Sequence, residues 1–179
     1  MFLYRKLIPF LILFGLAACK SDNKASDSKK TYFDIRGFFA KEANRLAAKR
    51  PAVQKSISDN GNIESRKVTV ADWGSELSLF SESDINKPSW RNSYRVSKRG
   101  SVITYTAKDS KIRTQKVTIR LSDKSQVSYI AIRNQSENML YSSNEMLEYY
   151  PDSLYRIVKQ QNVKVLGSHR YLIEGRLRL

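Results

Sequence analysis

The chain has 179 residues and is strongly basic, with 32 lysines and arginines against 17 aspartates and glutamates and a formal net charge of +15. Its single cysteine excludes an intrachain disulfide, and its single histidine excludes a metal site built from several histidines. The fold must therefore be stabilised by its own core, and a partner selected by charge is expected to be anionic.

The first residues have the layout of an export signal. Arg5 and Lys6 precede an apolar run over residues 7–16. This run is too short to cross a bilayer, which takes about 20 apolar residues. A positive start, a short apolar stretch and small residues at its end are typical of a cleaved signal peptide, here residues 1–18. Two alternatives stay open: a buried N-terminal helix, and an ordinary secretory signal cut after Ala18.

The apolar run ends on Leu16-Ala17-Ala18-Cys19, which contains the only cysteine. This string resembles the lipobox of bacterial lipoproteins, the precursors that signal peptidase II cleaves. The resemblance covers the first 19 residues, and it implies a thioether between Cys19 and diacylglycerol and acylation, for example by palmitate, of the new amine. A single acyl chain holds a protein weakly, whereas two or more hold it stably. Cys19 is therefore expected to be a lipid attachment site.

Residues 19–30 form a polar segment without large apolar side chains. Such a composition cannot bury enough surface to fold, so we expect a flexible tether with an end-to-end distance on the order of 20 Å. In similar lipoproteins an aspartate after the cysteine favours the inner membrane, and here that residue is Lys20. The resemblance therefore implies a Gram-negative envelope protein anchored in the outer membrane, on its periplasmic side or at the cell surface.

Residues 31–179 have the length of a single domain and contain no internal repeat. Apolar residues recur with helical spacing over residues 35–47, and Pro51 ends this first predicted helix. A second helix is predicted near residues 73–83, with Asp72 as its N-cap. The apolar stripe of the second helix consists of Trp73, Leu77 and Phe80.

The remaining segments predict strands separated by short turns. The expected strands are residues 53–58, 63–70, 94–96, 102–107, 116–121, 127–133, 154–159, 163–166 and 170–174. Turn sequences are found at Asp59-Asn60-Gly61-Asn62, which is a strong hairpin signal, and at residues 98–100, 109–111, 122–125, 134–138 and 166–169. The expected fold is α+β, with two N-terminal helices packed on one face of a meandering antiparallel sheet.

Positive charge is concentrated in residues 87–133, which contain twelve lysines or arginines and only two acids. On strands this excess is expected to form a basic sheet face, and the candidate anion-binding residues are Arg95, Arg113, Lys116 and Arg120. Each cation near an anionic membrane contributes about 1 kcal/mol to binding. The other interpretation is a solvated face whose lysines protect strand edges from aggregation.

Sequence patterns of catalysis and metal binding are absent. His169 is expected in a solvated turn, and no Gly-x-Ser-x-Gly elbow occurs. Both Ser-x-x-Lys spacings, at residues 21–24 and 26–29, fall inside the expected tether. The turn at residues 59–62 lacks the ligand spacing of an EF-hand. We expect no catalytic residue, no metal and no cofactor.

These observations favour a non-enzymatic, lipid-anchored envelope module. Its expected partners are the membrane, through the anchor, and an anionic lipid, lipid A, an acidic glycan or another envelope protein. One alternative is a glycan- or lipid-handling accessory protein whose sheet cups its ligand, and a second is an envelope hydrolase. Nucleic acid is the usual partner of a basic domain, but an exported, tethered protein rarely meets it, so none is expected.

Overall fold

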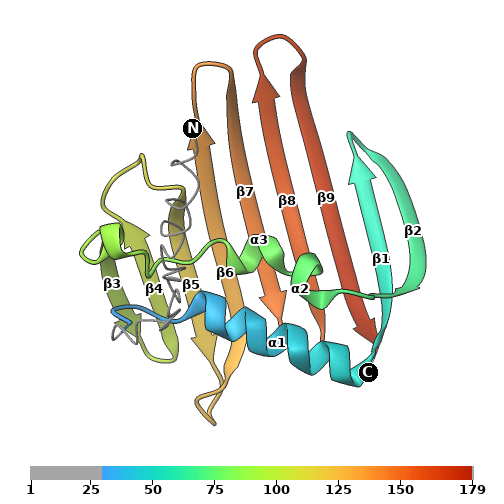
Figure 1. Ribbon diagram of the computed structural model, residues 1–179, viewed down its shortest axis with the longest axis horizontal. Coiled ribbons are helices and arrows are strands. Elements are labelled where there is room, and N and C mark those ends of the chain that lie inside the picture. The colour runs from blue at the N-terminus through green and yellow to red at the C-terminus, as the bar shows by residue number, and fades with distance from the viewer. Residues whose placement is uncertain (1–29, 179) are drawn as a thin grey trace, which may run out of the picture.

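The computed structural model describes residues 30–178, so the expected signal peptide and Cys19 lie outside the described residues. The described chain forms a nine-stranded antiparallel sheet crossed by one long helix (Figure 1). In chain order the elements are α1 (Ile35–Lys49), β1 (Ala52–Asp59), β2 (Asn62–Thr69), α2 (Trp73–Glu76), α3 (Ser78–Ser81), the 3-10 helix η1 (Pro88–Trp90), β3 (Tyr94–Arg99), β4 (Val102–Ala107), β5 (Thr114–Leu121), β6 (Val127–Glu137), β7 (Tyr141–Tyr150), β8 (Leu154–Val163) and β9 (Gly167–Arg178).

The sheet joins the two ends of the described chain. Strands β3 to β9 lie side by side in chain order, and β1 pairs with β9, which gives the order β2-β1-β9-β8-β7-β6-β5-β4-β3. The expected hairpin turn between β1 and β2 is confirmed, because Asp59 pairs with Asn62. Asn60 and Gly61 have φ of 48° and 98°, as the primed turns of tight hairpins require.

Helix α1 is the first predicted helix, and it lies across one face of the sheet (Figure 1). It begins where the Asp34 side chain accepts a hydrogen bond of 2.9 Å from the Gly37 amide. It ends at Arg50, whose left-handed conformation precedes Pro51. Its buried residue Phe39 packs edge-on against Tyr149 of β7 at 5.2 Å between ring centroids. The face of the sheet that carries Tyr149 is called the inner face below.

The expected fold class is wrong in its helical part. Only α1 is a long helix, and the second predicted helix is a pair of four-residue helices, α2 and α3, which follow β1 and β2 instead of preceding the sheet. The break falls at Leu77, whose φ of −98° and ψ of 11° are not helical. Serine hydroxyls compete for backbone groups where α3 ends. Ser81 Oγ donates to the Ser78 carbonyl at 2.9 Å, and Ser83 Oγ donates to the Leu79 carbonyl at 2.8 Å.

Two details of the predicted strands also differ from the structure. The expected turn at residues 134–138 is largely strand, since β6 continues to Glu137 and β7 follows after the turn at residues 138–140. Asn138 alone organises that turn, because its Oδ1 accepts from the amides of Leu140 at 2.8 Å and Tyr141 at 2.9 Å. The expected strand at residues 163–166 is mostly the turn between β8 and β9.

The core lies between the inner face and the three α-helices and is rich in aromatic rings. The stripe predicted for the second helix is buried in it. Two buried tyrosines reach polar partners on the helices: Tyr149 donates to Glu42 of α1 and Tyr155 donates to Glu76 of α2, both at 2.6 Å. Burial is the main cause that raises the pKa of both phenols, and the carboxylate partners add to it. These hydroxyls are therefore fixed donors that tie the helices to the sheet.

Candidate anion-binding face

Strand alternation places part of the basic segment on the face opposite the helices, which is called the outer face. In β5, Val117 and Ile119 are buried on the inner face, whereas Lys116 and Arg120 are exposed on the outer face. Arg95 of β3 belongs to the same face, because Tyr94 beside it is buried among the core rings. The structure therefore places Arg95, Lys116 and Arg120 on one face of the sheet.

Two arginines that the sequence interpretation did not single out complete this surface. The register aligns Arg95 with Thr106, Thr106 with Lys116, and Lys116 with Arg133 of β6. A second row aligns Arg99 with Val102 and Val102 with Arg120. The outer basic face is defined here as Arg95, Arg99, Lys116, Arg120 and Arg133.

The dimensions of the outer basic face follow from sheet geometry. Neighbouring strands lie about 4.8 Å apart, so the row from Arg95 to Arg133 is about 14 Å wide. The rise of about 3.4 Å per residue places Lys116 and Arg120 about 14 Å apart along β5. This patch exceeds a single phosphate in size, and it fits several anionic groups presented on a surface.

The outer basic face has no compensating acid within it. The outer-face positions of β3, β4 and β5 contain no Asp or Glu, and the one acid at such a position in β6 is Glu137, at the end of the strand. None of its five cations makes an ion pair with any residue between 30 and 178. Lys116 and Arg133 are directly opposite each other, an arrangement of like charges that weakens strand pairing.

The outer face of β7 to β9 is arranged in the opposite way. Arg156 of β8 lies between Glu148 and Glu174, with nitrogen–oxygen distances of 3.3 and 2.7 Å, and Arg176 also contacts Glu174 at 2.7 Å. Hydrogen bonds from Arg176 and then Arg156 hold the pKa of Glu174 below its usual value, against an opposing effect of burial. In this half Glu148 and Glu174 therefore neutralise Arg156 and Arg176, whereas Arg170 and Arg178 of β9 make no ion pair within residues 30–178.

Tyr129 of β6 forms the border between the two halves. The Arg120 guanidinium lies 5.3 Å from the centre of its ring, and the Tyr129 hydroxyl donates to Glu148 at 2.8 Å. The ring of Tyr150 lies 4.6 Å away. Burial, followed by the Glu148 hydrogen bond, raises the pKa of the Tyr129 phenol. Tyr129 therefore lies between the free cation Arg120 and the acid Glu148 of the paired half.

Arg113 does not belong to the outer basic face, which corrects the expected residue set. Its side chain turns to the inner face and pairs with Glu145 at 2.7 Å. Glu145 is buried, also lies 3.5 Å from Lys159, and accepts from Asn134 at 3.2 Å. Asn134 in turn donates to Ser83 at 2.9 Å, next to α3. Arg113 thus belongs to a polar cluster that closes the edge of the core.

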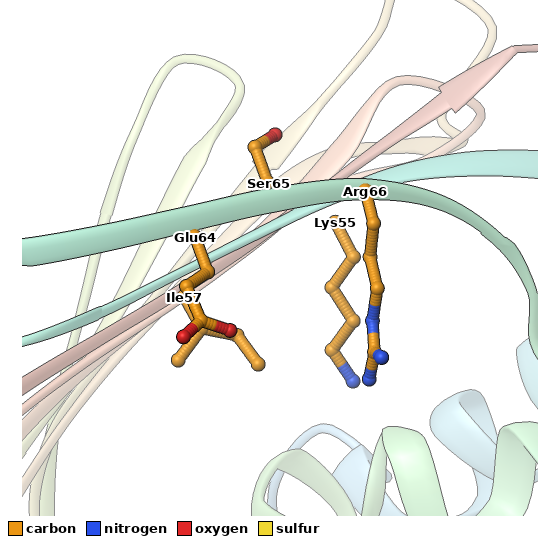
Figure 2. Close-up of a pocket in the computed structure, with 5 residues that line it drawn as sticks. All are labelled: Lys55, Ile57, Glu64, Ser65 and Arg66. Atoms are coloured by element: carbon orange, nitrogen blue, oxygen red, sulfur yellow. The ribbon is translucent and has the colours of Figure 1, made fainter.

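A shallow hollow of about 330 Å³ lies at the other edge of the sheet. Figure 2 shows Lys55, Ile57, Glu64 and Arg66 directed to the same side of the β1–β2 hairpin, whereas Ser65 is directed to the other side. Lys55 is already engaged by Glu76 of α2 at 2.8 Å. A lining of charged side chains with one apolar residue does not offer the apolar cup expected of a lipid or sugar carrier.

No family model matches this chain, and no curated protein matches it. Within residues 30–178, no group of three or more His, Cys, Asp or Glu side chains could hold a metal ion. No helix in this range is long and apolar enough to cross a membrane. His169 lies in β9 instead of a turn, where its Nδ1 is 3.2 Å from Asn60 Nδ2 and its ring stacks on Tyr171.

Proposed function

We propose that this protein is a lipid-anchored envelope module that binds a phosphate-bearing membrane surface through the outer basic face. Cys19 is the proposed anchor, and the outer membrane is the proposed location. The observation that carries the binding proposal is the group of five unpaired cations on β3 to β6, next to a region of the same face where Arg156 and Arg176 are paired with acids. Cross-strand repulsion between Lys116 and Arg133 disfavours folding, and a bound anion would relieve it.

The energetics of such a surface suit a weak, salt-dependent contact. Each lysine or arginine near an anionic membrane contributes about 1 kcal/mol, which corresponds to about fivefold in binding. Several cations together give useful affinity only when the anions lie within about one Debye length. This length is about 10 Å at 0.1 M salt and about 3 Å at 1 M, so binding should weaken as salt is added. A lipid anchor removes most of the translational cost, since it keeps the domain beside its target.

The binding proposal is tested with the fragment of residues 20–179 after its cooperative unfolding has been checked. Sedimentation with phosphatidylglycerol–phosphatidylcholine vesicles should show binding that weakens steeply with salt. Lys116→Gln should reduce the partition coefficient about fivefold. Lys67→Gln is the matched control, because Lys67 is also an exposed outer-face lysine but lies on β2 at the far edge of the sheet. Equal losses for the two variants, or no binding, would leave the solvated-face interpretation.

The anchor proposal has a separate test. Metabolic labelling with a palmitate analogue should mark the full chain and should not mark a Cys19→Ala variant. Equal labelling of the two chains would exclude Cys19 as the attachment site, and it would leave the vesicle result unaffected.

A further inference from the structure

Two neighbouring hairpins carry exposed apolar side chains at their tips. The β6–β7 turn presents Met139 and Leu140, which are 83% and 69% exposed, and the β8–β9 turn presents Val165 and Leu166, which are 90% and 73% exposed. The two turns lie at the same end of the sheet, beyond the helices (Figure 1). A hydrogen bond of 3.1 Å from the Lys164 amide to the Leu140 carbonyl joins them. These four side chains are called the apolar tips.

The apolar tips are separated from the core by a polar belt. Three consecutive register rows across β6, β7, β8 and β9 contain only polar residues. The rows are Gln135-Asn144-Gln160-Arg170, Ser136-Ser143-Gln161-His169 and Glu137-Ser142-Asn162-Ser168. The apolar tips are therefore not an extension of the core, and no described side chain covers them.

The composition of the two turns is also unusual for exposed loops. Tight turns favour Gly, Asn, Asp, Pro and Ser because these residues fit the backbone, and here Asn138 and Gly167 perform that task at the bases of the turns. The outermost positions are large and apolar, although turn geometry does not require it. Scattered apolar residues are normal on a surface, whereas a contiguous exposed patch indicates a contact.

We propose that the apolar tips insert into the lipid bilayer to which the protein is anchored; this inference depends on the proposed anchor at Cys19. The order of apolar and polar residues at this end of the sheet matches the order of acyl chains and headgroups at a membrane surface. The polar belt is about 10 Å thick, from three rows with a rise of about 3.4 Å, which is comparable to a headgroup layer. Tyr141 lies at the boundary, where membrane proteins concentrate tyrosine, and the exposed Lys164 in the β8–β9 turn has a side chain long enough to extend back to lipid phosphates.

The expected tether is long enough for this arrangement. The described chain begins beside Tyr32, whose ring contacts Tyr105 of β4 at 5.7 Å between centroids. Register aligns Tyr105 with Leu147 of β7, so the tips lie about 20 Å farther along the strands and about 14 Å across them, or about 25 Å away. Residues 19–30 can extend to about 40 Å. The anchor and the apolar tips can therefore reach one bilayer together.

Tip insertion is compatible with the outer basic face on the same membrane. Arg133 and Met139 belong to the same β6–β7 hairpin and are about 20 Å apart along it. A sheet that leans toward its outer face would place Arg133 at the headgroups while Met139 inserts. The two contacts differ in chemistry, because apolar insertion also occurs in uncharged lipid whereas the basic face requires anions.

The test uses the full chain reconstituted in phosphatidylcholine vesicles, where the basic face has no anionic partner. A Leu166→Cys variant is labelled with an environment-sensitive fluorophore, and quenching by lipids with a quencher in their acyl chains is measured. We expect blue-shifted emission and at least threefold stronger quenching than for the control Val96→Cys. Val96 is half-exposed on β3, in the register row of Leu147 and far from the tips. The unsubstituted chain measures any labelling of Cys19.

A second variant is the control for insertion caused by the label itself. Met139→Ser combined with Leu140→Ser, on the opposite hairpin, should at least halve the quenching of the label at position 166, because both tips insert together. Equal quenching at positions 166 and 96 would overturn the proposal. Excimer emission from a pyrene label at position 166 would also overturn it, since a second copy would then cover the tips. Failure of salt-dependent binding to anionic vesicles would not change any of these results.

Discussion

On β3 to β5 the outer face presents Arg95, Arg99, Lys116 and Arg120 without a carboxylate, whereas on β7 to β9 Glu148 and Glu174 pair with Arg156 and Arg176. Both halves belong to one continuous sheet, so strand geometry does not explain the difference. The paired half shows that this sheet accommodates acids opposite arginines. The absence of acids from the outer-face positions of β3, β4 and β5 is thus a property of the sequence there, and it leaves the cations free for an external anion.

The largest expected effect on stability comes from glycine substitutions, which we compare between the two halves. Gly175 lies on the inner face of the paired half, and Gly100 lies in a turn of the unpaired half. A Cβ at Gly175 would overlap the ring of buried Tyr155, whereas a Cβ at Gly100, in the β3–β4 turn with φ of 56°, meets no atom within 4 Å. Gly175→Ala should lower the free energy of unfolding by about 3 kcal/mol. Gly100→Ala should lower it by about 1 kcal/mol through backbone strain. Urea denaturation measures both, and equal losses would contradict the packing described for Tyr155.

Removing an arginine should cost stability only in the paired half. Arg156→Gln leaves Glu148 and Glu174 without their partner, and it should lower the free energy of unfolding by about 1 kcal/mol, since the group is partly exposed. Arg95→Gln removes a cation without an ion-pair partner in the described chain, so it should change stability by less than about 0.5 kcal/mol. Urea midpoints at pH 7 compare the two variants. A larger loss for Arg95→Gln would reverse the assignment of the halves.

The paired half should also be the pH-sensitive one. The pKa of Glu174 is lowered in the folded protein from a usual value of 4.5, so its contribution is complete above about pH 4.5 and is lost as the pH falls through the lower folded value. Thermal unfolding of the unsubstituted chain and Glu174→Gln should therefore differ at pH 7 and converge toward pH 3. A difference that grows on acidification would mean that the carboxylate is not stabilised in the fold.

The smallest expected effect has opposite signs for stability and binding. Lys116→Glu places a carboxylate directly opposite Arg133, and it should raise the free energy of unfolding by about 0.5 kcal/mol through a favourable cross-strand pair. The same change should weaken binding to phosphatidylglycerol vesicles more than Lys116→Gln does. Urea denaturation and vesicle sedimentation measure the two quantities. A loss of both stability and binding would show that Lys116 has a structural role.

Local signals in the sequence were sufficient for the elements that depend on them. Helix α1 follows from its apolar spacing and from Pro51, and the first hairpin follows from Asn60-Gly61, whose positive φ values few other residues adopt. Strand β7 was missed because Ser143 and Glu145 occupy inward positions that are normally apolar. Their burial depends on partners distant in sequence, and Arg113 is one of them.

In the candidate site, too, only the features that depend on local sequence could be predicted. Alternation grouped Lys116 with Arg120, but a β-bulge between Thr114 and Lys116 interrupts it, so spacing alone could not predict the inward direction of Arg113. Arg133 could have been found from the alternation of β6, where Ile130 and Ile132 are buried. That these strands are neighbours depends on the long-range register, and no local pattern specifies that Glu148 and Glu174 pair with arginines on the other half.

The most direct test of the account removes the same charge from each half and measures binding of the 20–179 fragment to phosphatidylglycerol vesicles at low salt. Lys116→Gln combined with Arg133→Gln should reduce the partition coefficient about 30-fold, from about 1 kcal/mol per cation. Arg156→Gln combined with Arg176→Gln removes the same charge but should reduce it by less than about fivefold, because β8 and β9 lie two and three strands, about 10 and 14 Å, beyond Arg133. Equal reductions in both double variants would show that binding depends on net charge alone and would contradict a specific basic face.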